Sequence, residues 1–476
     1  MTQTSLRTCE IIPNENISFP VGTAVAVQTY SSKLGFERIF ETFKRRGIPI
    51  VRLLEALLTY RLTENRSTTK ASEWINRPDV LLQFSINGFE ERTLFRVLEI
   101  LGENYEEALY RLREKLFSCY DFPHTDTNLD WTSLVLWGKK ADLGAYGYSQ
   151  DHRPDKKQVT YGIAEIGSPV NVPIGLTIMP GNTNDQSHFM KTFRQVEPCL
   201  RQGSLLTFDK GGQSKANLEA ILASKMKYMT AKKLNLSDDQ RIRRFNKSKA
   251  ELIDRDEGVY GLKRKYPSRT DYFYFSEQLK QNQIEMKLRR AEQKLLEAKE
   301  IQRCIEKHRQ LPKRFRINNP LVDVVYRYQT KLPGLTEQQA RQLVQAAELN
   351  GREGFFCLVS SEDLTLADAL RIYRMKDSIE KIFQSMKNDI NISPLRVWSN
   401  NSICGAIFVG FLAQLIISLM RYDHPKLKHL SPKSIKISLS NLTVTVERAA
   451  QRAKRRIYSN FDPVNGLIVA QNLAVT

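Results

Sequence analysis

The chain has 476 residues and carries 72 Lys and Arg against 52 Asp and Glu, a formal net charge of +20. This length predicts two or three domains with ample core, and the cationic excess favours a polyanion as partner: nucleic acid first, an anionic membrane surface second. A merely soluble basic protein is the remaining alternative. The six cysteines are dispersed without a CxxC pair, which argues against a zinc site and against a secreted disulfide framework.

The N-terminal part of the chain has a helical pattern. Residues 1 to about 25 show no clear periodicity and no apolar signal-peptide core, so we expect an irregular start. From about 33 to 118, apolar residues recur at spacings of three and four, which predicts helices. Residues 1–120 are therefore expected to form a helical domain. The basic segments KRRG and NRSTTKASEW favour contact of this domain with DNA, and a plain helical bundle is the alternative.

The pattern changes at about residue 127. Three strand-like segments follow, TNLDWTSLVLW, VTYGIAEIG and VPIGLTIMPGN, and then a helix, the short strand SLLTFD, a second helix and the strand KYMTAKK. The order β-β-β-α-β-α-β is that of a ribonuclease-H-like core. The predicted fold class is α/β, with a mixed five-stranded sheet and helices, and we assign residues 125–231 and 354–420 to this core.

A charged stretch, residues 232–353, interrupts the alternation and is expected to be an insertion subdomain. The run SEQLKQNQIEMKLRRAEQKLLEAKEIQRCIEKHRQL predicts a long helix, either an arm or short coiled coil, or a solvated helix over the core. DYFYF and DVVYRYQ predict strands on either side of it. GREGFFCLVSS predicts a further strand, which leads into a helix that contains Tyr373.

The C-terminal part of the chain contains one strongly apolar segment. Ile403 to Met420 reaches the lower length limit for a membrane-spanning helix. We favour a buried core helix, because the segment stands alone in a basic chain; a membrane-anchored basic protein is the alternative. Residues 421–476 form a basic C-terminal region, in which TVERAAQRAKRRIY predicts a helix with a cationic face, either DNA-binding or solvated.

Two aspartates occupy strand positions that suit metal binding. Asp130 lies inside an apolar strand, where a carboxylate is costly unless it is paired or binds a metal. Asp126 is its competitor, although it precedes the strand. Asp209 ends the run LLTF, and sites in open α/β sheets gather at the carboxyl ends of strands. For each aspartate taken singly, a turn or cap role is the alternative.

The segment YRMKDSIEKIFQSMK carries the most distinctive spacing in the chain. On an α-helix, Tyr373, Glu380 and Lys387 share one face because seven residues drift only ~20° round the axis. Lys376 joins that face through its i, i+4 relation to Glu380. A carboxylate flanked by cations and an aromatic ring fits metal-dependent chemistry on a nucleic acid backbone. A charged amphipathic surface helix is the alternative.

The pattern Y-x2-K-x3-E-x6-K resembles the Y-x2-R-x3-E-x6-K signature of prokaryotic insertion-sequence transposases of the DDE type, the IS-four family. Lys376 stands where that family usually has Arg, so the charge is kept and the bidentate fork is lost. The resemblance implies that Asp130, Asp209 and Glu380 hold two Mg²⁺ or Mn²⁺ ions. It also implies that Tyr373, Lys376 and Lys387 hold the terminal phosphates of the element.

A second segment, GYSQDHRPDKKQ, resembles the GYSxDHRPD element of the sixteen-thirty-four-type branch of that family. The resemblance implies DNA contacts near the cleaved end from Tyr148, His152, Arg153 and Lys156; a polar surface loop is the alternative. Some relatives flip a base of a DNA hairpin onto a Trp in the insert. All four Trp residues of this chain lie outside residues 232–353, so the hairpin route lacks that side chain here.

These observations together predict a DNA transposase that cleaves the ends of an insertion sequence and joins them to target DNA. Its expected partners are double-stranded DNA and a second copy of the chain, without a membrane. By resemblance it would be cytoplasmic and nucleoid-associated in a prokaryote. The alternatives are a ribonuclease-H-like nuclease without strand transfer and a catalytically dead DNA-binding protein.

Overall fold

The computed structural model describes residues 17–44, 46–64, 66–138, 141–147, 153, 155–307, 309–310, 337–393, 395–447 and 455–473. Its contacts divide the chain into a first unit, Met1–Tyr228 with Tyr373–Thr476, and a second unit, Met229–Ile372. The chain leaves the first unit within strand β6 (Lys227–Lys232) and returns to it within helix α15 (Leu366–Met375).

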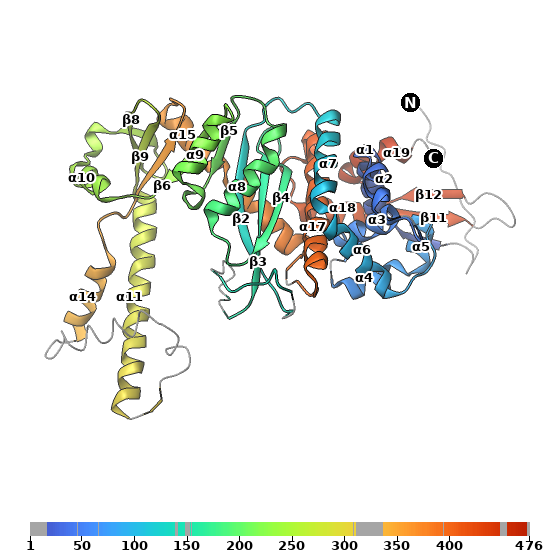
Figure 1. Ribbon diagram of the computed structural model, residues 1–476, viewed down its shortest axis with the longest axis horizontal. Helices are drawn as coiled ribbons and strands as arrows, with labels where there is room; N and C mark the ends of the chain where they lie inside the picture. The colour runs from blue at the N-terminus through green and yellow to red at the C-terminus, as the bar shows by residue number, and fades with distance from the viewer. Residues whose placement is uncertain are drawn as a thin grey trace. The chain divides into compact units, whose positions relative to one another are not determined.

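A mixed sheet lies at the centre of the first unit (Figure 1). Its strands stand in the order β4 (Val172–Pro180), β3 (Gln158–Ile166), β2 (Thr127–Val135) and β5 (Leu205–Phe208). β4, β3 and β2 are antiparallel neighbours, whereas β5 runs parallel to β2. Every residue of β3 is buried, and in β2 Asp130 is the one that is partly exposed.

Different helices cover the two faces of this sheet. The helices of this region are α8 (Asp185–Val196), α9 (Lys215–Ala223), α16 (Asp377–Gln384) and α17 (Asn400–Asp423). On one face, Trp131 stacks on His188 of α8, and on the other Tyr161 of β3 meets Phe383 of α16. Because side chains alternate along a strand, Asp130 points to the face that α16 covers.

The predicted order of elements is confirmed between residues 127 and 232. β2, β3 and β4 are followed by α8, β5, α9 and β6, which is β-β-β-α-β-α-β. Local patterning succeeds here because each strand is a short apolar run between turns, and each helix carries its own N-cap. Asn184 caps α8 and Ser214 caps α9 through side-chain oxygens that accept backbone N–H bonds.

The N-terminal part of the first unit is helical, as predicted. Its helices are α1 (Gly22–Lys33), α2 (Phe36–Phe40), α3 (Ile50–Arg61), α4 (Thr68–Ile75), α5 (Pro78–Phe84), α6 (Glu91–Glu103) and α7 (Tyr105–Cys119). The expectation of an irregular start up to residue 25 is wrong, because β1 (Ile17–Pro20) and the first turn of α1 lie within it. β1 becomes a strand by pairing with a segment more than four hundred residues away, which no local pattern reveals.

The predicted cationic helix over residues 445–458 is also wrong. The structure has β11 (Thr443–Glu447) and β12 (Arg455–Ser459), an antiparallel pair that β1 extends to a three-stranded sheet. Val444 and Val446 alternate with polar residues and are buried, so burial favours a strand at the start of this segment. The Ala- and Arg-rich part of the predicted helix, residues 448–454, lies outside the described residues. Helices α18 (Pro432–Asn441) and α19 (Pro463–Leu473) flank the pair in sequence.

Helix α17 is the core helix of the first unit. It is long and apolar enough to cross a membrane by composition, yet 94% of its apolar window is buried within the protein. It crosses α6 so closely that a Cβ on Gly102 would lie 1.7 Å from the carbonyl oxygen of Asn401, and one on Gly405 would lie 2.0 Å from that of Leu98. Packing therefore accounts for the apolar run, in agreement with the core-helix prediction.

The second unit is built on an antiparallel sheet in the order β6, β10, β9, β8, β7. Its further elements are α10 (Leu236–Arg244), β7 (Glu251–Asp254), β8 (Val259–Lys265), β9 (Thr270–Ser276), α11 (Glu277–Glu306), α14 (Glu337–Glu348) and β10 (Phe355–Ser360). The strands predicted from DYFYF and GREGFFCLVSS are β9 and β10, and the predicted long helix is α11. The strand predicted from DVVYRYQ lies outside the described residues.

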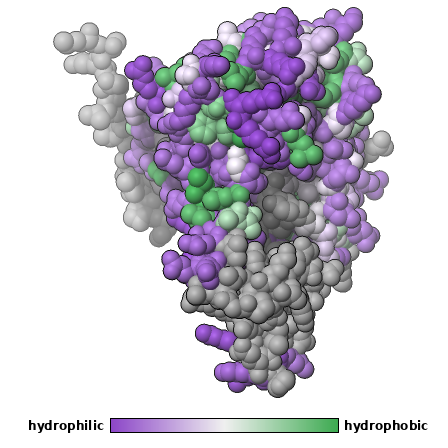
Figure 2. Space-filling model, turned by 90° about the vertical axis from the view of Figure 1, so that its left-hand side faces the viewer, coloured by the Kyte–Doolittle hydropathy of each residue, from purple (hydrophilic) through white to green (hydrophobic). Residues whose placement is uncertain are grey.

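The long helix α11 is an arm rather than a helix laid over the sheet (Figure 1). α14 runs beside it, and Arg341 forms an ion pair with Glu292 at 3.0 Å across the two helices. A second pair joins Lys294 to Glu348. The face of the molecule in Figure 2 is largely hydrophilic, with hydrophobic side chains in separate small groups. Such a surface suits solvent or a polar partner.

Candidate active site

The register of two parallel strands brings the predicted aspartates together. Leu129 of β2 pairs with Phe208 of β5. Asp130 directly follows Leu129, and Asp209 directly follows Phe208. The two aspartates therefore stand at neighbouring positions on strands about 4.8 Å apart. Asp209 follows the last residue of β5 and precedes a short 3-10 turn, η3 (Lys210–Gly212). The sequence-predicted pair is therefore one site.

Lys376 lies against Asp130 rather than in solvent. Its Nζ is 3.4 Å from Asp130 Oδ2, and the residue is only 8% exposed. Burial raises the pKa of Asp130 to about 6, the Lys376 ammonium opposes that rise, and the charge of Asp209 adds to it. The Lys side chain thus supplies the counter-charge that a buried carboxylate needs.

Tyr373 contacts the second aspartate. Its hydroxyl donates a hydrogen bond of 3.2 Å to Asp209 Oδ1. Burial and the neighbouring Asp209 carboxylate raise the pKa of Tyr373, so its hydroxyl remains a donor over the physiological range. Tyr373 and Lys376 are the first two residues of the Y-x2-K-x3-E-x6-K pattern. Each of them therefore contacts one aspartate.

The segment from Tyr373 to Lys387 is not one uninterrupted α-helix, which corrects the single-face prediction. α15 ends at Met375, α16 begins at Asp377, and residues 385–389 form a π-helical turn, η5 (Ser385–Asp389), that contains Lys387. A π turn has more residues per turn than an α-helix, so the seven-residue step no longer returns to the same face. Glu380 is exposed and makes no hydrogen bond or ion pair within the described part of the chain.

A third acid at this site was missed from the sequence. Glu165 of β3 is fully buried and stands opposite Asn128, which lies two residues before Asp130 on the same face of β2. Its Oε1 accepts hydrogen bonds from Asn128 Nδ2, at 3.1 Å, and from the hydroxyl of Ser378 in the first turn of α16. Burial raises the pKa of Glu165 to about 7. The sequence did contain a signal for Glu165, because it is an acid inside the otherwise apolar strand VTYGIAEIG.

A polar cleft of about 540 Å³ adjoins the η3 turn. Gly211 lines it together with Trp131, Thr132 and the loop at residues 181–186, part of PGNTNDQSHF. A Cβ on Gly211 would meet the Asp185 carboxylate at 2.3 Å, so glycine is required for this close approach.

Two of the residues predicted from GYSQDHRPDKKQ surround an exposed Trp. Arg153 Cζ lies 5.9 Å and Lys156 Nζ 4.9 Å from the ring centroid of Trp137. Arg153 also forms an ion pair of 2.8 Å with Asp155, which lowers the pKa of that carboxyl to about 2. Tyr148 and His152 lie outside the described residues.

The donor set at the site suits a hard divalent cation. Asp130 and Asp209 offer carboxylate oxygens side by side, which is the ligand type that Mg²⁺ and Mn²⁺ prefer. No group of three or more His, Cys, Asp or Glu side chains that could hold a metal comes together among the described residues. Glu380 does not approach the pair, so the fit rests on the two aspartates.

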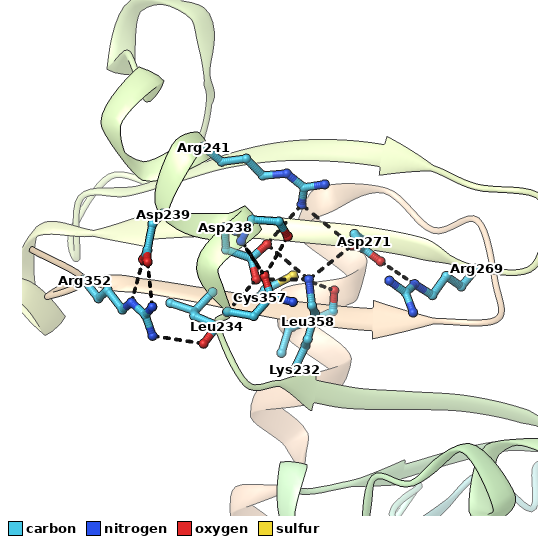
Figure 3. Close-up of polar contacts among 12 residues, drawn as sticks. Lys232, Leu234, Asp238, Asp239, Arg241, Arg269, Asp271, Arg352, Cys357 and Leu358 are labelled. Carbon is cyan, nitrogen blue, oxygen red and sulfur yellow. Dashed lines mark hydrogen bonds and ion pairs between the residues drawn. The ribbon is translucent and has the colours of Figure 1, made fainter.

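Buried acids also gather in the second unit, but cations already neutralise them (Figure 3). Asp238 and Asp271 are buried; Lys232 Nζ and Arg241 Nη1 lie 3.1 Å and 3.4 Å from Asp238 carboxylate oxygens. Arg269 donates to Asp271 at 2.9 Å. This cluster ties α10 to the sheet and is a structural ion-pair network rather than a metal site.

The chain also resembles known proteins. Residues 123–416 match the family described as "Transposase DDE domain". Among solved structures, the chain is similar to a cryo-EM structure of the piggyBac transposase synaptic complex with hairpin DNA, at 12% identity and a TM-score of 0.44, over 88% of this chain and 76% of that one. A search of curated proteins finds no match.

Proposed function

The chain belongs to the DDE transposase family and is a DNA transposase, and from this premise we propose that it is the transposase of a prokaryotic insertion sequence. The spacing of Tyr373, Lys376, Glu380 and Lys387 supports the IS-four family, and the GYSQDHRPD segment supports its sixteen-thirty-four-type branch. As an enzyme of this family it hydrolyses DNA phosphodiesters and transfers strands by transesterification.

We further propose that the sheet of the first unit is a ribonuclease-H-like core. The confirmed order β-β-β-α-β-α-β supports this assignment, with residues 125–231 and 354–420 as the core and 232–353 as its insert. Residues 1–120 would then contact DNA as an N-terminal helical domain, and the basic region 421–476 would follow the core.

The observation that carries the proposal is the double contact made by the signature segment. Tyr373 holds Asp209 and Lys376 holds Asp130, at neighbouring positions of two parallel strands. A chance stripe of surface charges would not place its first two members on two carboxylates from distant parts of the chain. Asp130, Asp209 and Glu380 are proposed as the catalytic and metal-binding residues.

Two Mg²⁺ or Mn²⁺ ions, when bound, would activate the attacking oxygen and stabilise the leaving one in an in-line displacement at phosphorus. Asp130 and Asp209 would hold them. Glu380, which is exposed on α16 and does not group with the two aspartates in this structure, is proposed as the third ligand from the spacing of the signature alone. The Tyr373 hydroxyl orients the Asp209 carboxylate, and the Lys376 ammonium balances the charge of Asp130. We propose that the polar cleft beside Gly211, which Trp131 and Thr132 also line, receives a DNA strand.

The remaining assignments concern DNA and assembly. Lys387, Tyr148, His152, Arg153 and Lys156 are proposed to contact the DNA near the cleaved end. Trp137 offers a cation-lined aromatic surface for a base beside Arg153 and Lys156. A homodimer on paired element ends, in the cytoplasm and at the nucleoid of a prokaryote, is the proposed working form.

The test uses the full-length protein, DNA that carries the inverted repeats flanking the gene, a target plasmid and Mg²⁺. We expect end cleavage followed by joined products, and both should be lost in Asp209→Asn while end binding is retained. Asp121→Asn, a matched change at a highly exposed side chain of the first unit, should behave like wild type. Cleavage without any joined product would favour the nuclease alternative, and cleavage by Asp209→Asn would refute the metal assignment.

A further inference from the structure

A cationic cavity of about 590 Å³ lies in the first unit, apart from the two aspartates. It is formed where the turn between α3 and α4 meets the segment that follows η5. Its charged lining residues are Arg61, Arg66, Lys70 and Arg396, and no Asp or Glu is among the described residues that line it. Lys70 is ion-paired with Glu73 at 2.7 Å, so the positive charge of the cavity comes from its three arginines.

Arg61 is a buried guanidinium with unsatisfied hydrogen-bonding capacity. The residue is 7% exposed, and its Nη1 donates to the carbonyl oxygen of Arg66 at 2.9 Å. Its Nε is buried and has no hydrogen-bond partner. No carboxylate forms an ion pair with Arg61 in the described part of the chain. A buried charge without a counter-ion is costly, so an anion that enters the cavity would relieve this cost.

The other walls of the cavity also suit a phosphate. α4 begins at Thr68, and Ser67 caps it by accepting from the backbone N–H of Lys70 at 3.2 Å. The positive end of the helix dipole and its free amides favour an anion at this position. Arg66 and Arg396 are exposed at the cavity and form no ion pair within the described residues.

The cavity is tied to the strand that carries Asp130. Leu395, one of its lining residues, forms a parallel bridge with Leu136, and Trp137 donates its backbone N–H to Leu395 at 3.4 Å. Leu136 is six residues beyond Asp130, or about 20 Å along an extended strand.

We propose that this cavity binds a backbone phosphate of DNA, at a point on the DNA away from the phosphodiester that is cleaved at Asp130 and Asp209. The cavity is large enough for a nucleotide-sized group, and its exposed arginines face a solvent-accessible opening. The proposal rests on the proposed function for its choice of DNA as the anion. The cavity would position the DNA through residues of two regions, the N-terminal end of α4 and the segment that follows η5.

The test measures DNA binding without cleavage. An Asp209→Asn protein in a chelating buffer is titrated with a fluorescent duplex of random sequence, and the Kd is followed across a series of KCl concentrations. Adding Arg66→Gln and Arg396→Gln should weaken binding about tenfold and reduce the slope of log K against log [KCl] by about 0.9, the value for one lost phosphate. Arg194→Gln is the matched control, because the Arg194 guanidinium is already ion-paired with Glu197 at 2.8 Å.

A second measurement examines Arg61 directly. Potassium phosphate, compared with KCl at equal ionic strength, should raise the melting temperature of the wild-type protein and not that of Arg61→Met. An unchanged Kd and slope in the Arg66 and Arg396 double variant would overturn the proposal. If phosphate stabilises the wild-type protein but the Arg66 and Arg396 double variant keeps the wild-type slope of log K against log [KCl], the cavity binds a free anion instead of DNA. Failure of the Asp209→Asn protein to bind any duplex would overturn the proposed function itself, and this role with it.

Discussion

Replacing Glu165 with Gln is expected to stabilise the first unit at pH 8 and to leave it nearly unchanged at pH 4.5. The Glu165 carboxyl is fully buried, and one of its oxygens, Oε2, has no hydrogen-bond partner. Gln has the shape of the protonated acid and cannot ionise. Its carbonyl oxygen can still accept the hydrogen bonds from Asn128 and Ser378.

The size of the expected change in stability follows from the pKa of Glu165. Burial raises the pKa of Glu165 from its ordinary value of 4.5 to about 7. The folded protein therefore keeps a proton that the unfolded chain releases, so stability is full below pH 4.5 and falls as pH rises through 7. A difference of about 2.5 in pKa corresponds to about 3 kcal/mol lost at pH 8. Asp130, whose pKa is raised to about 6, contributes in the same direction in both proteins.

The assay is urea denaturation at pH 5 and pH 8 in a chelating buffer, followed by hydrogen exchange of β2 and β3. Wild type should lose stability between these pH values, and Glu165→Gln should lose about 3 kcal/mol less. Glu219→Gln, a matched change at an exposed position on α9, should follow wild type. Identical pH dependence in wild type and Glu165→Gln would refute the reasoning, because the buried carboxyl would then not titrate between the two states.

Three further substitutions probe other parts of the structure. Tyr373→Phe removes the hydrogen bond to Asp209 and should lower the rate of end cleavage about 2- to 10-fold with an unchanged melting temperature; a wild-type rate would exclude an orienting role. Asp238→Asn removes the nearer of the two acids that pair with Lys232 and Arg241 and leaves both cations only Asp271, at 3.8 Å. It should destabilise the second unit by about 3 kcal/mol, seen as faster hydrogen exchange in β9 and β10 alone. Gly102→Ala places a Cβ against backbone and should cost about 3 kcal/mol in denaturation of the first unit; full stability would mean that α6 and α17 can separate at no cost.

The local pattern of the chain was enough for the elements around the site. Apolar runs of strand length, separated by turn residues and capped helices, determine the order from β2 to β6. The same patterning singled out Asp130 as an acid inside an apolar strand and Asp209 as an acid at a strand end. The predicted order of elements is confirmed because each element depends on a few consecutive residues and on their alternation, whereas the catalytic role of the two aspartates stays a prediction.

Pairing and burial between distant segments decided the rest. The register of β2 with β5 places Asp130 beside Asp209, and the β1–β11 pair turns a predicted helix into a strand. The break between α15 and α16 and the π turn after α16 interrupt the single helical face that was predicted for Tyr373, Glu380 and Lys387.

The sequence by itself therefore determined the order of the elements around the site and which residues are candidates for its chemistry, because residue type and short-range spacing are local properties. The tertiary structure alone decided which of them meet. It placed Glu165 next to Asp130, and it brought Arg61 and Arg396 to one cavity from opposite ends of the chain. Such contacts depend on strand register and helix packing, which are set by burial over the whole unit and not by any single segment.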